Sequence, residues 1–236
     1  MNNNDKNIWD HHQNANRSHL VKWYPRQTLI SKLVLKYLPK WSNILEIGFW
    51  DGFLLNKNSL NWFNVIGQDL SQKNIDITKK QWNNKKIEFI LWDNSWKFSF
   101  DNNSIDAFIA SEVLEHMDEK QLKICISEIF RILKKWGYAF ITFPAKENLK
   151  NNECICPNCS TVFHKWWHKQ YWDESKIKDS FSKFNIIKQT EIFNRYTWNS
   201  ITENFIWYFM YFTRKILNKF INLEGKSYLL ILKKND

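Results

Sequence analysis

The stretch Ile44-Leu45-Glu46-Ile47-Gly48-Phe49-Trp50-Asp51-Gly52 decides the predicted fold. Its apolar first half predicts a strand, its two glycines predict a tight turn, and the apolar residues from Phe53 onward predict a helix. Glycine suits such a turn because it takes positive φ readily and lets the backbone approach a ligand. The N-terminus of the following helix offers N–H groups to that ligand. These features predict the first unit of a nucleotide-binding α/β domain, with Trp50 standing where a third glycine is expected.

The stretch resembles motif I (E-x-G-x-G-x-G) of the class I S-adenosylmethionine-dependent methyltransferases. The resemblance implies a Rossmann-like sheet of seven mostly parallel strands, with helices on both faces and an antiparallel last strand. It also implies that Glu46, Gly48, Trp50 and Gly52 line the methionine end of S-adenosylmethionine. A dinucleotide-dependent dehydrogenase is the competing interpretation, because G-x-G-x-x-G uses the same physics. The spacing of Gly48, position 50 and Gly52 fits the methyltransferase better.

Further cofactor contacts are expected where later strands end. Asp69 ends the second expected strand about 20 residues after the glycine turn, where a carboxylate can accept hydrogen bonds from ribose hydroxyls. Leu70 follows it and is included in the expected site. The resemblance implies that Asp93, with Asn94 beside it, bonds the adenine amino group.

The segment Ser111-Glu112-Val113-Leu114-Glu115-His116 resembles the loop after the fourth strand in the UbiE-like, type 11 group of methyltransferases. Ser111 is therefore expected to contact the cofactor. His116 is a candidate general base, because an unperturbed histidine has a pKa near 6.5. The alternative is that His116 orients the loop, and this structural role is favoured. Tyr24, at the start of an expected helix, is a candidate cation–π partner of the sulfonium, with core packing as its alternative.

Four residues in one short segment form a potential metal-ligand set. They are Cys156, Cys159, His164 and His168. C-x₂-C places two thiolates together, and two histidines spaced by three residues share one face of a helical turn, so the set predicts a structural, tetrahedral zinc site. One group of type 11-like enzymes is similar, with a C-P-x-C-G-x-x-F-H-x-x-G-H insertion after the fifth strand. Ser160 and Trp167 replace the glycines of that pattern. Free thiols are the alternative.

Length and composition predict one domain over residues 1–236, because 44% hydrophobic residues suffice for a core. Within it, residues 1–40 are expected to form a lead-in and a covering helix, and residues 150–172 the zinc-knuckle insertion. The aromatic segment 195–223 is interpreted as a substrate lid, or as a peripheral membrane contact. Neither a membrane span nor a signal peptide is predicted, so a cytoplasmic location is expected.

The net charge of +10 is scattered and forms no basic tract. The expected methyl acceptor is a small molecule, a lipid or a glycan. A nucleic-acid methyltransferase remains an alternative, because positive charge favours phosphate backbones. A non-catalytic binding module is another, because a genuine indole at position 50 would occupy cofactor space. The sequence predicts no oligomeric state.

Tryptophan and glycine occur in abnormal numbers, 14 and 5 respectively. Glycine alone usually makes up about 7% of a protein. Several tryptophans stand where turn chemistry asks for glycine, among them Trp41, Trp50, Trp92 and Trp136. We hypothesise that many of them are encoded by UGA codons that the source organism reads as glycine. A genuinely tryptophan-rich protein is the alternative.

Overall fold

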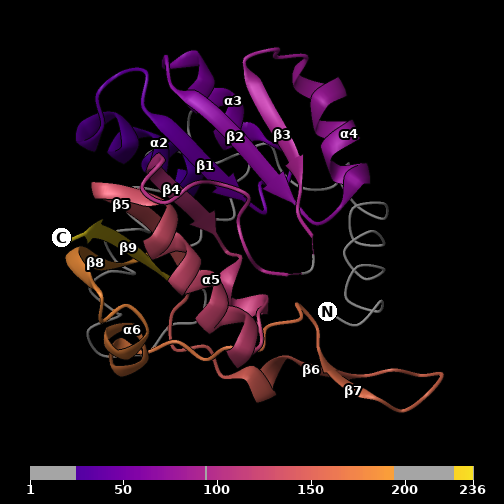
Figure 1. The fold of residues 1–236 in the computed structure, drawn as a ribbon. Coiled ribbons are helices and arrows are strands. Elements are labelled where there is room, and N and C mark those ends of the chain that lie inside the picture. Colours follow the sequence, from indigo (N-terminus) through magenta and orange to yellow (C-terminus); the bar gives the residue numbers. More distant parts are fainter. Residues whose placement is uncertain (1–24, 94, 194–225, 236) are drawn as a thin grey trace, which may run out of the picture.

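The computed structural model describes residues 25–93, 95–193 and 226–235. A seven-stranded sheet in the order β3-β2-β1-β4-β5-β9-β8 forms its centre (Figure 1). The strands are β1 (Asn43–Ile47), β2 (Asn64–Asp69), β3 (Ile87–Leu91), β4 (Ile105–Ser111), β5 (Leu133–Pro144), β8 (Phe184–Phe193) and β9 (Lys226–Lys234). The neighbouring strands β3, β2, β1, β4 and β5 pair in parallel. Strand β9 pairs antiparallel with both β5 and β8. The predicted Rossmann-like fold of the methyltransferases is thereby confirmed.

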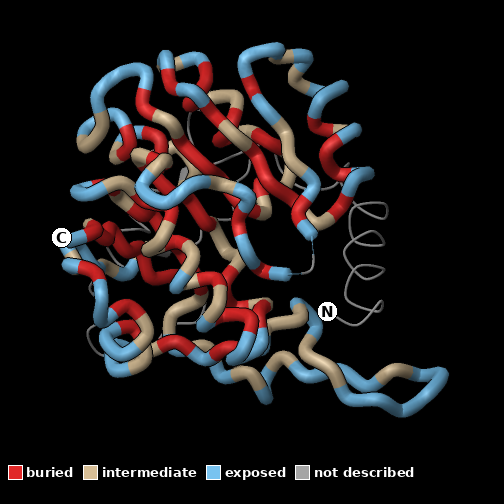
Figure 2. The backbone as a smooth tube through the Cα atoms, viewed as in Figure 1, coloured by how far each residue is buried: buried red, intermediate tan, exposed pale blue. Residues whose placement is uncertain are grey.

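Helices cover both faces of the sheet. They are α2 (Pro25–Tyr37), α3 (Phe53–Leu60), α4 (Gln72–Trp82), α5 (Glu119–Ile132) and α6 (Glu174–Ser180). Side chains alternate along a strand, so Ile44 packs with α2, α3 and α4, whereas its neighbour Leu45 joins the core beneath α5 and α6. Burial on both faces explains why the central strands are continuous apolar runs. Figure 2 shows this buried sheet between exposed outer surfaces.

The strand register aligns the carboxyl ends of the central strands. Glu46 lies opposite Gly67 and Ile47 opposite Gln68 in the β1–β2 pair, and Ile47 lies opposite Ala110 in the β1–β4 pair. In open α/β sheets, ligands bind outside this carboxyl edge. The loops after β1, β2, β4 and β5 are therefore the ones that position a site.

A projecting hairpin and a 3₁₀ turn follow β5. The turn is η3 (Leu149–Asn152), and the hairpin pairs β6 (Glu153–Ile155) with β7 (Val162–His164). Figure 1 shows the hairpin extending away from the sheet, and Figure 2 shows that much of its surface is exposed. The hairpin lies within the segment 150–172, which the sequence predicts to be an insertion after the fifth strand.

Six of the ten described tryptophans have a left-handed backbone. These left-handed tryptophans, with their φ values, are Trp41 (71°), Trp50 (51°), Trp62 (68°), Trp96 (61°), Trp136 (67°) and Trp167 (57°). Positive φ is a genuine outlier for a bulky side chain, whereas glycine adopts it freely. The backbone thus supports the hypothesis that these positions carry glycine. Trp92, which the sequence also suggested, does not have positive φ and lies outside this set.

Some sequence predictions fall on residues that the structure does not describe. They concern Tyr24, Asn94, the segment before residue 25 and the whole of the expected lid 195–223. Among the described helices, none combines the length and apolar character that crossing a membrane requires.

Candidate active site

The glycine turn after β1 has the geometry that its sequence predicts. Gly48 and Gly52 have φ values of 58° and 72°, and the N–H of Gly48 donates to the Gln68 carbonyl at 2.9 Å. A Cβ added to Gly48 would lie 2.7 Å from a methyl carbon of Val113. A Cβ added to Gly52 would likewise meet Thr78. Both positions therefore require glycine for space as well as for φ, and Trp50 is the misfit between them.

Glu46 is a buried carboxylate beside this turn. Its residue is 3% exposed, and its Oε2 has no hydrogen-bond partner within the described part of the chain. Burial, followed by the charge of Asp51, raises the pKa of Glu46 well above its ordinary value. A buried acceptor without a donor is costly. The site therefore fits a ligand that brings a cationic or N–H group to Glu46.

Asp69 lies at the carboxyl end of β2 and is 9% exposed. Its Oδ1 accepts the backbone N–H of Ser71 at 2.9 Å, and its Oδ2 accepts the side-chain amide of Asn74 at 2.7 Å. A carboxylate has about four lone-pair sites, so neither contact exhausts its oxygen. The contacts fix the carboxylate at the start of α4, with half-buried Leu70 next to it.

Two indoles lie beside Asp69 where β3 ends. The backbone N–H of Trp92 donates to the Asp69 carbonyl at 2.8 Å, whereas its indole N–H donates to the Lys97 carbonyl at 3.1 Å. The rings of Trp92 and Trp96 meet edge to face with centroids 4.8 Å apart. Both are buried, and Trp96 leaves its indole N–H without an acceptor among the described residues. Asp93 is exposed and accepts bonds from Ser95, which lower the pKa of Asp93. Both indoles therefore pack in the core, whereas the predicted adenine contact Asp93 stays at the surface.

The loop after β4 joins both ends of the described chain to the carboxyl edge. Arg26, at the start of α2, forms an ion pair of 2.9 Å with Glu112, and Ser227 of β9 donates to the same carboxylate at 3.2 Å. Glu112 has positive φ (57°). The predicted cofactor contact Ser111 is half-buried and lies 3.3 Å from the hydroxyl of Thr142. The first turn of α2 thus lies at the edge where the resemblance expects a covering helix.

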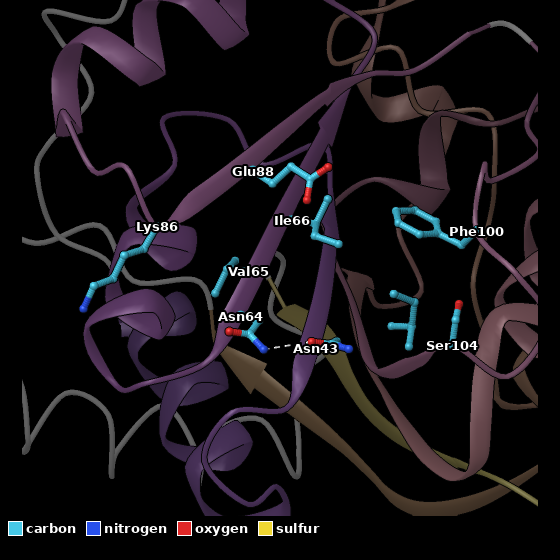
Figure 3. A pocket seen from close by; sticks show the side chains of 9 residues that line it. Asn43, Asn64, Val65, Ile66, Lys86, Glu88, Phe100 and Ser104 are labelled. Carbon is cyan, nitrogen blue, oxygen red and sulfur yellow. Dashed lines mark hydrogen bonds between the residues drawn. The ribbon is translucent and has the colours of Figure 1, made fainter.

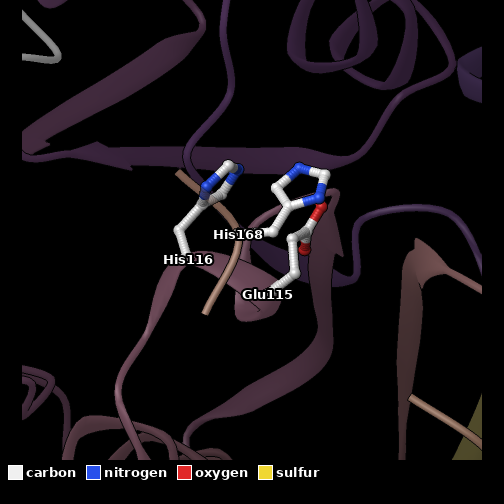
Figure 4. Close-up of side chains that lie close together, drawn as sticks. All are labelled: Glu115, His116 and His168. Atoms are coloured by element: carbon white, nitrogen blue, oxygen red, sulfur yellow. The ribbon is translucent and has the colours of Figure 1, made fainter. Parts of the chain in front are cut away.

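His116 belongs to a group with Glu115 and His168, whose ligand atoms all lie within 4.8 Å of one another. Figure 4 shows the Glu115 carboxylate turned toward His168, with His116 on the other side of that ring. The Nδ1 of His116 lies 3.3 Å from the Trp167 carbonyl. Burial, followed by the charge of His168, lowers the pKa of His116 to about 3. Such an imidazole is a weak base, so the geometry favours the loop-orienting role.

A second group joins His164 and His168 to Glu147, which follows β5. The Nδ1 of His168 lies 2.5 Å from a Glu147 oxygen, and the Nε2 of His164 lies 3.6 Å from the other. Burial lowers the pKa of His164, and the nearby His168 lowers it further. Burial is the largest single influence on Glu147 and raises its pKa, but the hydrogen bond from His168, the charges of His168 and His164 and the bond from Asn152 together lower it below its ordinary value. The two groups share His168 and form one cluster at the carboxyl edge.

Cys156 and Cys159 lie at the far end of the β6–β7 hairpin. The carbonyl of Cys156 accepts the backbone N–H of Ser160, which has positive φ (56°). Hydrogen bonding with Thr161 and with Cys156 lowers the pKa of Cys159. This is the local turn expected of a metal-binding knuckle. However, neither cysteine belongs to the described groups whose ligand atoms lie within 4.8 Å. The structure therefore brings the cysteines together and the histidines together, but not the two pairs.

Sequence reasoning missed the acidic residues and the arginine of this region. Arg26, Glu112, Glu115 and Glu147 all lie at the carboxyl edge, and none was assigned a ligand-binding role. Glu147 had a usable signal, since it comes three residues after the apolar strand ending at Pro144. The pairing of Arg26 with Glu112 spans 86 positions of sequence and has no local signal.

A cavity of about 320 Å³ lies elsewhere (Figure 3). Its lining includes Asn43, Asn64 and Ile105, which begin β1, β2 and β4. The cavity is therefore at the amino ends of the strands, away from the glycine turn, and it does not belong to the candidate site.

Part of the chain matches a known protein family. Residues 45–141 match the family model of a methyltransferase domain. This methyltransferase-domain match begins within β1 and ends within β5, so it covers the glycine turn, Asp69 and the loop of His116. No curated protein matches the chain in sequence.

Solved structures share the fold at low sequence identity. The N-methyltransferase NodS of Bradyrhizobium japonicum, in complex with S-adenosylhomocysteine, is 15% identical with a TM-score of 0.67, over 99% of this chain and 100% of that one. A SAM-dependent methyltransferase of Methanosarcina mazei is 16% identical (TM-score 0.64; 91% and 99% covered). A structure of the complex between the Haloferax volcanii Trm112 methyltransferase activator and the putative methyltransferase is 15% identical in sequence with a TM-score of 0.63. The match covers 100% of this chain and 95% of that one.

Proposed function

We propose that this protein transfers a methyl group from S-adenosylmethionine to an acceptor. The observation that carries the proposal is the turn after β1, where Gly48 and Gly52 are left-handed and the buried Glu46 has an oxygen to which no described residue donates. The match of residues 45–141 to a methyltransferase domain supports it. When bound, S-adenosylmethionine supplies an electrophilic methyl group on a sulfonium.

The chain's own residues would bind and orient this cofactor from β1 and β2. Glu46 offers its free oxygen to the α-ammonium of the methionine portion, and the open backbone of Gly48 allows close approach. Asp69, held in place by Ser71 and Asn74, offers its carboxylate to the ribose hydroxyls. The loops after β4 and β5 then face the acceptor, whose alignment is the main contribution of the protein to an in-line displacement.

Calorimetric titration with S-adenosylhomocysteine tests this assignment. We expect Asp69→Ala to weaken binding at least about tenfold, because it removes an acceptor of charge-assisted hydrogen bonds. Asp76→Ala is the matched control, since Asp76 bonds only Gln72 on the exposed side of α4 and should leave affinity unchanged. Thermal unfolding of each variant separates lost affinity from a weakened start of α4. Equal affinities of the two variants, or preferential binding of NAD, would contradict the proposal.

Glu46→Gln should improve stability while weakening cofactor binding. Because its folded-state pKa is raised, the neutral carboxyl contributes stability below pH 4.5 that is lost as pH rises through the folded pKa. Glutamine removes this loss, so the variant should be more stable at neutral pH by about 1–3 kcal/mol. Urea unfolding at pH 4.5 and at neutral pH measures the difference. A variant that is destabilised equally at both pH values would show that Glu46 already has a partner.

The acceptor class that we propose is a small molecule, a lipid or a glycan. A nucleic-acid acceptor is the second candidate, favoured by the net charge of +10. RNA binding that weakens steeply with salt would select it, because phosphate contacts release counterions. A zinc ion held by Cys156, Cys159, His164 and His168 stays a prediction, and the cysteine variants described below test it.

A further inference from the structure

The His–Glu cluster after β4 and β5 has more buried polar atoms than its hydrogen bonds satisfy. Both carboxylate oxygens of Glu115 are buried without a hydrogen-bond partner in the described residues, and so is the Nε2 of His164. Glu115 is 0% exposed. Buried charges in proteins are paired or coordinate metals. The cluster therefore has the composition of a site that accepts a cation.

We propose that Glu147, His164 and His168 bind one divalent transition-metal ion, and that the two cysteines of the hairpin are not its ligands. Two imidazoles and one carboxylate are the protein ligands of an open zinc site, whose fourth position holds water or substrate. The side chains are suitably enclosed, with exposures of 18% for Glu147, 7% for His164 and 12% for His168.

The distances in the cluster agree with such a site. Ligands about 2.05 Å from a tetrahedral ion lie about 3.3 Å from one another. The Nδ1 of His168 lies 2.5 Å from Oε2 of Glu147, and the Nε2 of His164 lies 3.6 Å from Oε1 of Glu147. The rings of His164 and His168 stack with centroids 4.8 Å apart. The three donors therefore lie close enough to share one ion after a local rearrangement.

Coordination has a defined consequence for His164. In the structure its Nδ1 accepts the backbone N–H groups of Trp166, at 3.3 Å, and of His168, at 3.1 Å. The ring proton therefore lies on Nε2, facing Glu147. Coordination through Nε2 moves the proton to Nδ1, so the 164–168 turn must shift when the ion binds. Trp167 has positive φ within this turn, so glycine at 167 would ease the shift.

Glu115 and His116 enclose the remaining side of the ion. Their ligand atoms lie within 4.8 Å of His168, and the Glu115 backbone carbonyl accepts the N–H groups of Lys169 and Gln170. The loop after β4 is thus fastened to the segment that carries the histidines. An ion held by Glu147, His164 and His168 would therefore have this loop beside it.

The experiment measures metal binding on the full chain after treatment with a chelator. Zn²⁺ is titrated by calorimetry, and Co²⁺ by its absorption spectrum, in which thiolate coordination gives charge-transfer bands that imidazole and carboxylate do not. The variants are Glu147→Gln, Glu153→Gln as a matched control on the neighbouring hairpin, and the double variant Cys156→Ser/Cys159→Ser. Glu153 is exposed and belongs to neither group of ligand atoms.

We expect one ion per chain, an affinity at least about tenfold lower in Glu147→Gln, and no loss in Glu153→Gln or in the double cysteine variant. The Co²⁺ spectrum should lack thiolate bands. Loss of binding in the cysteine variant, thiolate bands, or an affinity independent of Glu147 would each overturn the proposal. These readouts do not involve methyl transfer, so they stand or fall separately from the proposed function.

Discussion

Replacing the six left-handed tryptophans with glycine is expected to raise the free energy of unfolding by about 3–6 kcal/mol. A left-handed backbone costs an L-residue roughly 1–2 kcal/mol, whereas glycine adopts it freely. Lost indole packing offsets only part of this gain, because Trp41, Trp62 and Trp136 are 62%, 49% and 50% exposed. The gain is large against a typical total stability of about 5–15 kcal/mol.

Urea unfolding of adjacent single variants gives the sharpest comparison. Trp167→Gly should stabilise, since position 167 has a φ of 57°. Trp166→Gly is the matched control, because Trp166 is 54% exposed and does not have positive φ, so glycine there should be neutral or destabilising. The codons give an independent check, with UGA expected at the six positions. Equal effects at 166 and 167, or UGG codons at all six positions, would contradict the hypothesis.

Replacing Trp172 with alanine should have the opposite effect and destabilise the protein by about 3–5 kcal/mol. Trp172 is 0% exposed, and its ring stacks on Phe143 with centroids 4.0 Å apart. It also lies 6.1 Å from the ring of Phe181, which joins α6 to the core. The loss combines transfer of a large apolar side chain to water with the cavity left behind. We therefore assign Trp172 as a genuine tryptophan, encoded by UGG.

The measurement is the urea midpoint of Trp172→Ala beside that of Trp166→Ala. The exposed Trp166 should give a change within about 0.5 kcal/mol, as surface substitutions usually do. If the two variants lose stability equally, Trp172 does not anchor the core. A stable Trp172→Gly variant would further suggest that glycine belongs at this position too.

Local sequence signals predicted most of the sheet. The second expected strand ends at Asp69, as β2 does, and Asp118 with Gln121 forms a capping box that starts α5. These features depend on neighbouring residues, so periodicity and capping chemistry reveal them. The glycine turn was also readable, because Gly48 and Gly52 are fixed by backbone conformation.

The His–Glu cluster after β4 and β5 was less predictable because it is assembled from distant segments. Residue types and spacing suggested that His164 and His168 join Cys156 and Cys159, but the hairpin separates the pairs. Their actual neighbour, Glu147, lies 21 positions before His168, and no motif connects them. Only the shared carboxyl edge of the sheet brings them together, and that edge is a property of the fold as a whole.

Glu112 connects regions that are far apart in the chain. Its carboxylate meets Arg26 of the first described helix and Ser227 of the last strand. The start of α2 and the start of β9 are therefore held by one carboxylate. A change at Glu112 would loosen both elements at once.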